Sequence, residues 1–561
     1  MQPLGVVGKS IPQIHSLAKT LGAATFASEL RMPGMLYGKV LRSPLPHARV
    51  LHVDVSRAKS LSGVKAVLLA QDTPGKKFGI SLADQLILAQ DKVRFVGDAL
   101  AAVAAIDEDT AEEAIGLIEV EYEELPAVFD PEEALKPQAP LVHGPKNLAS
   151  SLHYHRGDVE QGFRESDHVF ENRYTTQVKH QMYMERRSCL AVADPAGRVT
   201  VWGGFQSIYH TRQQLAAALD IPESKVRVVQ PLMGGGFGGK HYTSKPPLAA
   251  LLAIKTGKPV QIVNTWAEEF QAARPRTPGV IEQKIGVKKD GTLVARKIKV
   301  IVDCGAYLGN VPGVAQSMSI RAENLYRFSH INGVGLTVYT NNIPTGACRG
   351  FGNPEGHFAL ETQLDEIACQ LDIDPIELRL KNAIQAGQTS LHGWKIGSCG
   401  LKECLKLVAE TSGWRQRRGN RPGRGLGLAC AIHHSGYRNV PDFAGSSAFI
   451  KLEADGRVTL IIGEGDMGQG AWTVLLQIAA QGLGARFEDV QIASPDTEVA
   501  PDCLGAYAAR VTVAGGKAVL AAAADVQRQM MQVAAELLEA NPEDLQAEDS
   551  KVFVRGAPAR G

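Results

Sequence analysis

The sequence predicts a multidomain α/β protein, and three observations support this fold class. Its 561 residues exceed what one hydrophobic core can organise, so about two to four domains are expected. Hydrophobic residues make up 44% of the chain and charged residues 21%, which is ordinary for a globular protein and excludes wholesale disorder. Short β-rich runs alternate with helical stretches, as they do in α/β domains.

The first predicted domain covers residues 1–130. A helical pattern occupies 109–116, and the β-rich runs are 50–55, 64–69, 100–105 and 117–122. We expect these elements to form a self-contained α/β domain. Residues 131–145 are predicted to form a linker, because this short stretch contains four prolines: Pro131, Pro137, Pro140 and Pro145.

Two further α/β domains follow, over residues 146–387 and 388–561. The second domain has predicted strands at 226–231 and 298–303 and predicted helices at 247–256 and 357–371. The third contains an arginine-containing stretch, 413–427, that we interpret as a solvated loop. It continues with a hairpin of 448–453 and 458–462 across Asp455-Gly456, and with an amphipathic helix over 521–539. The pattern at 552–561 predicts a strand and a turn, which does not resemble a finished C-terminus.

The charge balance argues against nucleic-acid and membrane partners. The chain has 60 basic and 59 acidic residues, so it lacks the electrostatic footprint of a binder of nucleic acid or anionic membrane. No apolar run approaches the roughly 20 residues of a membrane span, and residues 1–10 lack the features of a signal peptide. We therefore expect a cytoplasmic protein that binds a small molecule or a protein partner.

The eight cysteines are scattered without the spacing of a zinc or iron–sulfur site. We expect each of them to be a small buried side chain in a reducing compartment.

The most informative segment is the glycine loop, residues 234–240, with the sequence GGGFGGK. Its bare backbone N–H groups can form a concavity for an anionic or polar ligand. A tight turn is the structural alternative. A nucleotide phosphate loop, G-x-x-x-x-G-K-[ST], is another, but His241 stands where the magnesium-binding hydroxyl is required. A nucleoside triphosphatase is therefore the minority interpretation.

Two further glycine-rich loops favour a larger ligand. They are residues 349–355 (RGFGNPE) and 463–470 (GEGDMGQG), and they add a guanidinium and a carboxamide. Three such loops fit a bulky cofactor with phosphate and heterocyclic edges better than a single phosphate.

Four motifs in order carry a family resemblance: residues 33–44 (PGMLYGKVLRSP), the glycine loop, residues 348–352 (CRGFG) and residues 467–470 (MGQG). Together they resemble the molybdopterin-binding large subunit of the xanthine dehydrogenase, aldehyde oxidase and 4-hydroxybenzoyl-CoA reductase family. The resemblance implies an N-terminal hammerhead-like α/β domain, then two molybdopterin-binding α/β domains, the last one incomplete.

The resemblance also implies a chemistry and a set of partners. In this family a molybdenum–molybdopterin cofactor, commonly the cytosine dinucleotide form in bacteria, oxidises an sp² carbon. Electrons then leave through iron–sulfur clusters and FAD. This chain has no motif for either group, so the resemblance implies an iron–sulfur subunit and an FAD subunit, and a dimer of such heteromers.

The resemblance assigns roles residue by residue. The residues implied to contact the cofactor are Gln206, Gly235, Gly236, Phe237, Gly238, Arg349, Met467, Gly468, Gln469 and Ala508. Those implied to surround molybdenum are Gln206, Phe237, Arg349 and Ala508. Those implied to contact the substrate are His241, Arg321 and Phe351. By pattern alone Phe351 fits an ordinary core position, Arg321 a surface ion pair and Gln206 a polar strand end.

Several positions depart from the family pattern. Purine-oxidising relatives have a glutamate where this chain has His241, so purine specificity is disfavoured. Carbon monoxide dehydrogenases have a copper-bound cysteine where this chain has Gly350, which disfavours CO oxidation. Ala509 and Val511 replace serines that are common in relatives, so two hydrogen bonds to the cofactor are missing, each worth roughly 0.5–1.5 kcal/mol.

The family's general base, a glutamate, lies beyond Gly561, and general-base catalysis contributes roughly 10²–10⁴-fold. We expect a separate chain to complete the domain, or the sequence to be a fragment; Glu464 and Asp466 are not assigned as substitutes. The main hypothesis is therefore a molybdenum hydroxylase subunit acting on an aromatic heterocycle, an aldehyde or an aryl-CoA-type substrate. The alternative is a non-catalytic or remnant chain.

Overall fold

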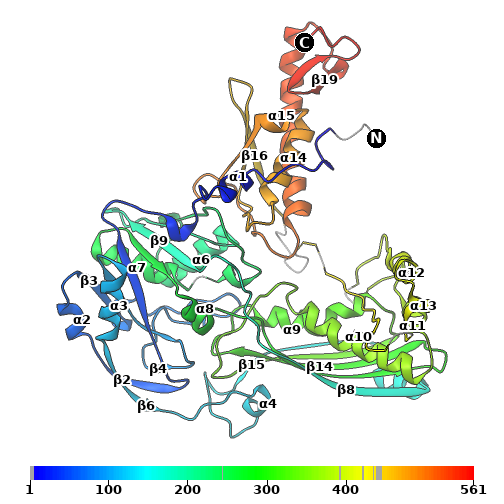
Figure 1. The fold of residues 1–561 in the computed structure, drawn as a ribbon, viewed down its shortest axis with the longest axis horizontal. Coiled ribbons are helices and arrows are strands. Elements are labelled where there is room, and N and C mark those ends of the chain that lie inside the picture. The colour runs from blue at the N-terminus through cyan, green and yellow to red at the C-terminus, as the bar shows by residue number, and fades with distance from the viewer. Residues whose placement is uncertain (1–4, 243, 391–392, 420–421, 434, 437–444) are drawn as a thin grey trace.

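The computed structural model describes residues 5–242, 244–390, 393–419, 422–433, 435–436 and 445–561. Residues 420–421 of the arginine-containing stretch lie outside these ranges. Two sheet-containing bodies lie side by side in the lower half of Figure 1. The C-terminal region, coloured orange to red, projects away from them.

A seven-stranded sheet forms the first body, with strand order β11-β10-β9-β12-β1-β5-β3. The strands are β1 (Leu36–Arg42), β3 (Val64–Leu69), β5 (Ala99–Ala105), β9 (Ser188–Ala193), β10 (Val199–Gly203), β11 (Val226–Val229) and β12 (Val260–Val263). The expectation of a self-contained domain over residues 1–130 is wrong in one respect, because β1 pairs in parallel with β12 and so joins the two segments. Strand periodicity marks strands but does not name their partners.

A small sheet, β4-β2-β6, lies beside the first one. Its strands are β2 (Ala48–Asp54), β4 (Lys92–Val93) and β6 (Glu119–Glu124). Helices α2 (Ser56–Ser60) and α3 (Glu108–Gly116) accompany them. The predicted start of α3 is set by Asp107, whose side chain accepts a hydrogen bond from Thr110 N and so caps the helix.

The second body is a five-stranded sheet, β7-β15-β14-β13-β8, covered by α9 and α10 (Figure 1). The strands are β7 (Leu148–Arg156), β8 (His168–Thr176), β13 (Gly279–Val287), β14 (Leu293–Gly305) and β15 (His330–Tyr339). The helices are α9 (Val311–Ile320) and α10 (Asn353–Gln370). The predicted linker is packed rather than loose, because it forms α4 (Pro131–Ala134) and buries Ala134 and Val142 in this core.

The remaining helices before the C-terminal region are α5 (Val159–Glu165), α6 (Ile208–Leu219), α7 (Pro246–Thr256), α8 (Trp266–Ala272), α11 (Pro375–Asn382), α12 (Leu401–Ser412) and α13 (Trp414–Arg417). Across the described ranges no helix combines the length and apolar character that a membrane crossing requires.

The C-terminal region contains the sheet β16-β17-β18 and two packed helices. Its elements are β16 (Ala448–Leu452), α14 (Ala471–Leu483), β17 (Val458–Ile462), β18 (Val490–Ala493), α15 (Gly516–Leu537), β19 (Leu545–Glu548) and β20 (Lys551–Val554). The predicted hairpin is confirmed, because β16 and β17 pair antiparallel. The predicted strand and turn at 552–561 are also present.

The N-terminal segment reaches this distant region, which the sequence did not indicate. It runs beside α14 in Figure 1 and then enters α1 (Ser16–Thr20). Ile14 N donates to Thr473 Oγ1 at 3.1 Å, and Gln13 Nε2 donates to Gly468 O at 3.1 Å. The segment therefore braces the 463–470 loop from outside.

A buried ion pair holds the C-terminal loops together. Arg510 and Glu464 are both 0% exposed, and Arg510 Nη1 lies 2.6 Å from Glu464 Oε1. The guanidinium also donates to Gly505 O at 3.0 Å and to Ser446 Oγ at 2.8 Å. It thus joins the 463–470 loop to the 503–510 segment.

Replacing Arg510 with methionine should destabilise this region by about 3–5 kcal/mol, because Glu464 would keep a buried charge without a partner. The urea midpoint of the C-terminal region, followed by Trp472 fluorescence, measures the loss. Arg528→Met is the matched control, since Arg528 forms an exposed pair with Asp525 worth about 0–1 kcal/mol. Equal midpoints for the two variants would contradict this role.

Candidate functional site

The glycine loop leaves β11 and reaches α7 through backbone conformations that favour glycine. Gly235 has φ +89° and Gly238 has φ +98°. A Cβ on Gly238 would lie 2.6 Å from Ala347 O, so only glycine allows this approach to the second loop. The bare backbone is therefore used partly for packing between loops.

Gln206 is the hub of the loop contacts. Its Oε1 accepts from Gly238 N at 2.9 Å and from Lys240 N at 3.2 Å. Its Nε2 donates to Ala506 O at 3.3 Å, and its backbone O accepts from Ala506 N at 2.7 Å. Within the described structure the second N–H of this amide has no partner, so Gln206 keeps one donor available.

The loops that the sequence singled out do lie together. Arg349 N donates to Phe237 O at 2.8 Å, which joins the second loop to the first. Gly235 N donates to Met467 O at 3.0 Å, which joins the third loop to the first. Gln469 Oε1 accepts from Met467 N at 2.6 Å and shapes its own loop. Residues from five distant segments thus meet: the three glycine-rich loops, Gln206 and Ala506.

The convergence leaves accessible groups at the surface. Phe237 is 43% exposed, and Arg349, Gly468 and Gln469 are exposed as well. No described residue forms a hydrogen bond or ion pair with the Arg349 guanidinium. Arg349 therefore presents a full set of unused donors beside Phe237.

Strained backbone is concentrated at the same loops. The described chain has ten non-glycine residues with positive φ, and four of them belong here: Phe237, Phe351, Ala508 and Ala509. Each such conformation costs of order 1–3 kcal/mol and persists only where the surroundings impose it. Such strain is typical of functional sites.

The three substrate candidates have different neighbours. Phe351 packs against Gly313 of α9, and Arg321 follows the end of the same helix. His241 instead stacks on His210, with ring centroids 5.0 Å apart, and meets the Tyr507 ring edge-on at 5.2 Å. No interaction between described residues links His241 to Phe351 or Arg321.

Burial keeps both stacked histidines neutral. Desolvation lowers the pKa of His241 to about 3, and His210 adds to this effect. Desolvation lowers the pKa of His210 to about 4. His241 therefore offers this site a neutral ring rather than a charge.

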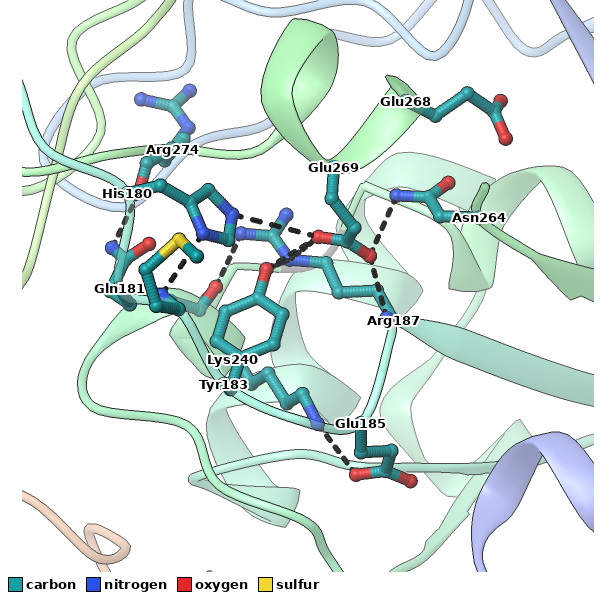
Figure 2. Close-up of polar contacts among 12 residues, drawn as sticks. His180, Gln181, Tyr183, Glu185, Arg187, Lys240, Asn264, Glu268, Glu269 and Arg274 are labelled. Atoms are coloured by element: carbon teal, nitrogen blue, oxygen red, sulfur yellow. Dashed lines mark hydrogen bonds and ion pairs between the residues drawn. The ribbon is translucent and has the colours of Figure 1, made fainter. Parts of the chain in front are cut away.

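The sequence did not reveal the polar network beneath the glycine loop (Figure 2). Lys240 Nζ pairs with Glu185 Oε2 at 2.5 Å, and both side chains are buried. Glu269, which is 0% exposed, accepts from Tyr183 Oη at 2.5 Å, Arg187 N at 2.6 Å and Asn264 Nδ2 at 3.0 Å. These residues are single polar positions without a motif, so no sequence signal identified them.

This network disfavours the phosphate-loop alternative. That interpretation requires the Lys240 ammonium to reach a nucleotide phosphate, but the ammonium is committed to Glu185. Helix α7 also begins at Pro246 and Pro247, which have no N–H to offer a phosphate.

Neither acidic residue of the third loop is a free base. Glu464 is held by Arg510 and Ser446, and Asp466 accepts from Gly468 N at 2.7 Å and Trp472 N at 3.1 Å. Both carboxylates therefore shape the loop.

The cysteines form no metal site with the other described residues, among which no group of three or more potential ligands occurs. Cys189, Cys304, Cys430 and Cys503 are buried as expected. The expectation is wrong for Cys369 and Cys404, which are exposed on the outer faces of α10 and α12.

Three family models match the chain in order. The aldehyde oxidase and xanthine dehydrogenase a/b hammerhead domain matches residues 21–126. Two molybdopterin cofactor-binding domains match residues 142–383 and 406–560.

Similar proteins include the xanthine dehydrogenase molybdenum-binding subunit of Escherichia coli O157:H7, 34% identical over 94% of this chain and 72% of that protein. The nicotinate dehydrogenase large molybdopterin subunit of Eubacterium barkeri is 38% identical over 72% of this chain and 96% of its own length. The crystal structure of quinoline 2-oxidoreductase from Pseudomonas putida 86 superposes with a TM-score of 0.91 and 30% identity, covering 99% of this chain and 74% of that one.

The chain belongs to the xanthine dehydrogenase and aldehyde oxidase family, as a molybdopterin-binding large subunit. The expected hammerhead domain followed by two molybdopterin-binding domains is confirmed.

The buried histidines predict a pH-dependent stability. In the unfolded chain His210 takes up a proton near pH 6.5, whereas in the folded protein it does so only near pH 4. Stability should therefore fall as the pH drops from 6.5 toward 4, because the unfolded state binds more protons there. His210→Phe should make the urea midpoint less dependent on pH in this window, whereas substitution of the exposed His52 should not. An unchanged pH profile in His210→Phe would contradict the assignment.

Proposed function

We propose that the converging loops bind a molybdenum–molybdopterin cofactor and that the protein is the molybdenum subunit of a hydroxylase. The single observation that carries the proposal is the meeting of Phe237, Arg349, Met467 and Ala506 around Gln206. Family membership supports the cofactor class, and the residue assignments are ours.

The residues present fit such a cofactor. An oxygen-rich anionic ligand needs fixed donors, and the Arg349 guanidinium and one Gln206 N–H are both unused by the described chain. Gly468 has φ +102° and only Met233 O near its missing Cβ, at 3.6 Å, so a flat ring system can approach its backbone. The donor set thus matches a pterin with phosphates.

When bound, this cofactor supplies the oxidising centre for an sp² carbon. The chain's own groups then have defined tasks. Gln206, Phe237 and Arg349, with Ala508, orient the groups around the metal, and the backbone of Gly235, Gly236 and Gly238 excludes water from it. Met467, Gly468 and Gln469 hold the pterin. Phe351 packs on the substrate, and Arg321 stabilises negative charge that develops on it.

The finer expectations belong to the same proposal. The cofactor is the cytosine dinucleotide form, and an iron–sulfur subunit and an FAD subunit of a cytoplasmic heteromer accept the electrons. Three substrate classes are expected: aromatic heterocycles, aldehydes and aryl-CoA compounds. Of these, aromatic heterocycles are the favoured substrates. The names of the quinoline and nicotinate relatives support this choice. No observation favours the non-catalytic alternative.

Arg349→Met should lower cofactor occupancy. Each charge-assisted hydrogen bond is worth about 1.5–3 kcal/mol, so losing one weakens binding about tenfold or more. Molybdenum per chain and pterin fluorescence of the purified complex measure the loss. Arg415→Met, at an 81% exposed arginine, is the control. Wild-type occupancy in Arg349→Met would remove the central residue of the proposal.

The substrate class is tested by profiling the complete complex with dye reduction. Quinoline- and pyridine-type heterocycles are expected to reduce the dye faster than aldehydes or aryl-CoA compounds. Xanthine and hypoxanthine belong in the panel, because the Escherichia coli relative is named as a xanthine dehydrogenase. A preference for purines would contradict the choice.

A further inference from the structure

A cavity lies beneath the glycine loop, and several cationic side chains line it. It is partly open to solvent, and its lining includes Arg186, Arg187, Lys240 and Lys245 together with Ser188 and Ser244. No carboxylate belongs to the lining. None of the residues assigned to the cofactor or substrate lines it, and Phe205 and Tyr242 of its lining are the chain neighbours of Gln206 and His241.

Three of the four cations already have partners. Lys240 pairs with Glu185 at 2.5 Å. Arg187 Nε donates to Tyr183 Oη at 3.1 Å, and its Nη2 donates to Gly239 O at 2.5 Å. Arg186 Nη1 donates to Asn264 O at 3.0 Å, a neutral acceptor that leaves its charge uncompensated.

Lys245 is different, because its ammonium has no hydrogen bond or ion pair with any described residue. The residue is only 6% exposed. Burial is the main cause that lowers the pKa of Lys245 to about 7. The charges of Arg42 and Arg187 lower this pKa further, whereas those of Glu268 and Glu269 raise it. An isolated buried ammonium is costly, so the cavity lacks a counterion.

The two nearby carboxylates are committed elsewhere. Glu268 pairs with Arg42 at 3.2 Å and accepts from Thr265 N at 2.8 Å. The contacts of Glu269 with Tyr183, Arg187 and Asn264 use both of its oxygens. Figure 2 shows Glu268 pointing away from this network. Neither carboxylate forms a hydrogen bond or ion pair with Lys245 in the described structure, so both act on its ammonium only at longer range.

Two further features favour an anion in this cavity. The Ser188 hydroxyl is buried and has no hydrogen-bond partner, so a donor is left unused at the cavity wall. Lys245 is also the N-cap of the 11-residue helix α7, whose positive dipole end adds to the local potential. The first two residues of α7 are prolines, so the helix itself offers no N–H there.

We propose that this cavity binds a small oxyanion, a carboxylate or a phosphate-type group, with Lys245 as its charge partner and Ser188 as a neutral donor. Bound there, the anion neutralises Lys245 and lies against Lys240, the last residue of the glycine loop. It would therefore rigidify the base of that loop.

The test is anion binding by the full chain, measured by calorimetry and thermal unfolding with inorganic phosphate and with acetate, at constant ionic strength in chloride. The wild type is expected to show saturable binding and a rise in Tm with at least one of the two anions. The anion that binds identifies the class. Lys245→Met should weaken binding at least tenfold, and Lys65→Met, at an exposed lysine, should not.

Lys245→Met is also expected to unfold at a higher temperature than the wild type without anion, because it removes an unpaired buried charge. If that variant does not fold, Ser188→Ala provides the second test and should weaken binding about two- to tenfold through loss of one hydrogen bond. Absence of saturable binding to the wild type, or equal binding by these variants and the wild type, would overturn the proposal. This test measures anion binding and not molybdenum content. The anion-site proposal and the cofactor proposal can therefore each fail without the other.

Discussion

The geometry of this protein depends on one constraint: backbone turns from four distant segments must meet closely enough to hydrogen-bond each other. The Gln206 amide satisfies that constraint by bonding to Gly238, Lys240 and Ala506 at once. Glycines permit the approach, since a Cβ on Gly238 would collide with Ala347 O. Side chains alone could not bring the turns this close.

Buried charge pairs fix the loops from behind. Glu185 with Lys240 holds the glycine loop, and Glu464 with Arg510 holds the third loop against the 503–510 segment. Such pairs contribute modest net stability after desolvation, but they are costly to break, so they specify position more than they add free energy. The positive φ values of Phe237, Phe351, Ala508 and Ala509 are tolerated because this framework imposes them.

The cavity at Lys245 lies beside the buried Glu185–Lys240 pair, but the Lys245 ammonium has no partner among the described residues. Every carboxylate nearby already has a partner, and the lysine faces an open space lined by cations. The unpaired Lys245 ammonium and the unmatched Ser188 hydroxyl give this cavity the composition of an anion site. The glycine loop thus lies between a proposed cofactor surface and a proposed anion cavity.

The sequence by itself determined the α/β class, most strands and helices, the hairpin at Asp455-Gly456 and the loops that carry the family motifs, because periodicity and glycine spacing are local signals. Tertiary structure alone decided that β1 completes a sheet with β12, that Gln13 braces Gly468, and that His241 stacks on His210. It also decided that Glu185, Glu269 and Lys245 surround the glycine loop. Those relations join residues far apart in the chain, and a lone polar residue has no pattern that names its partner.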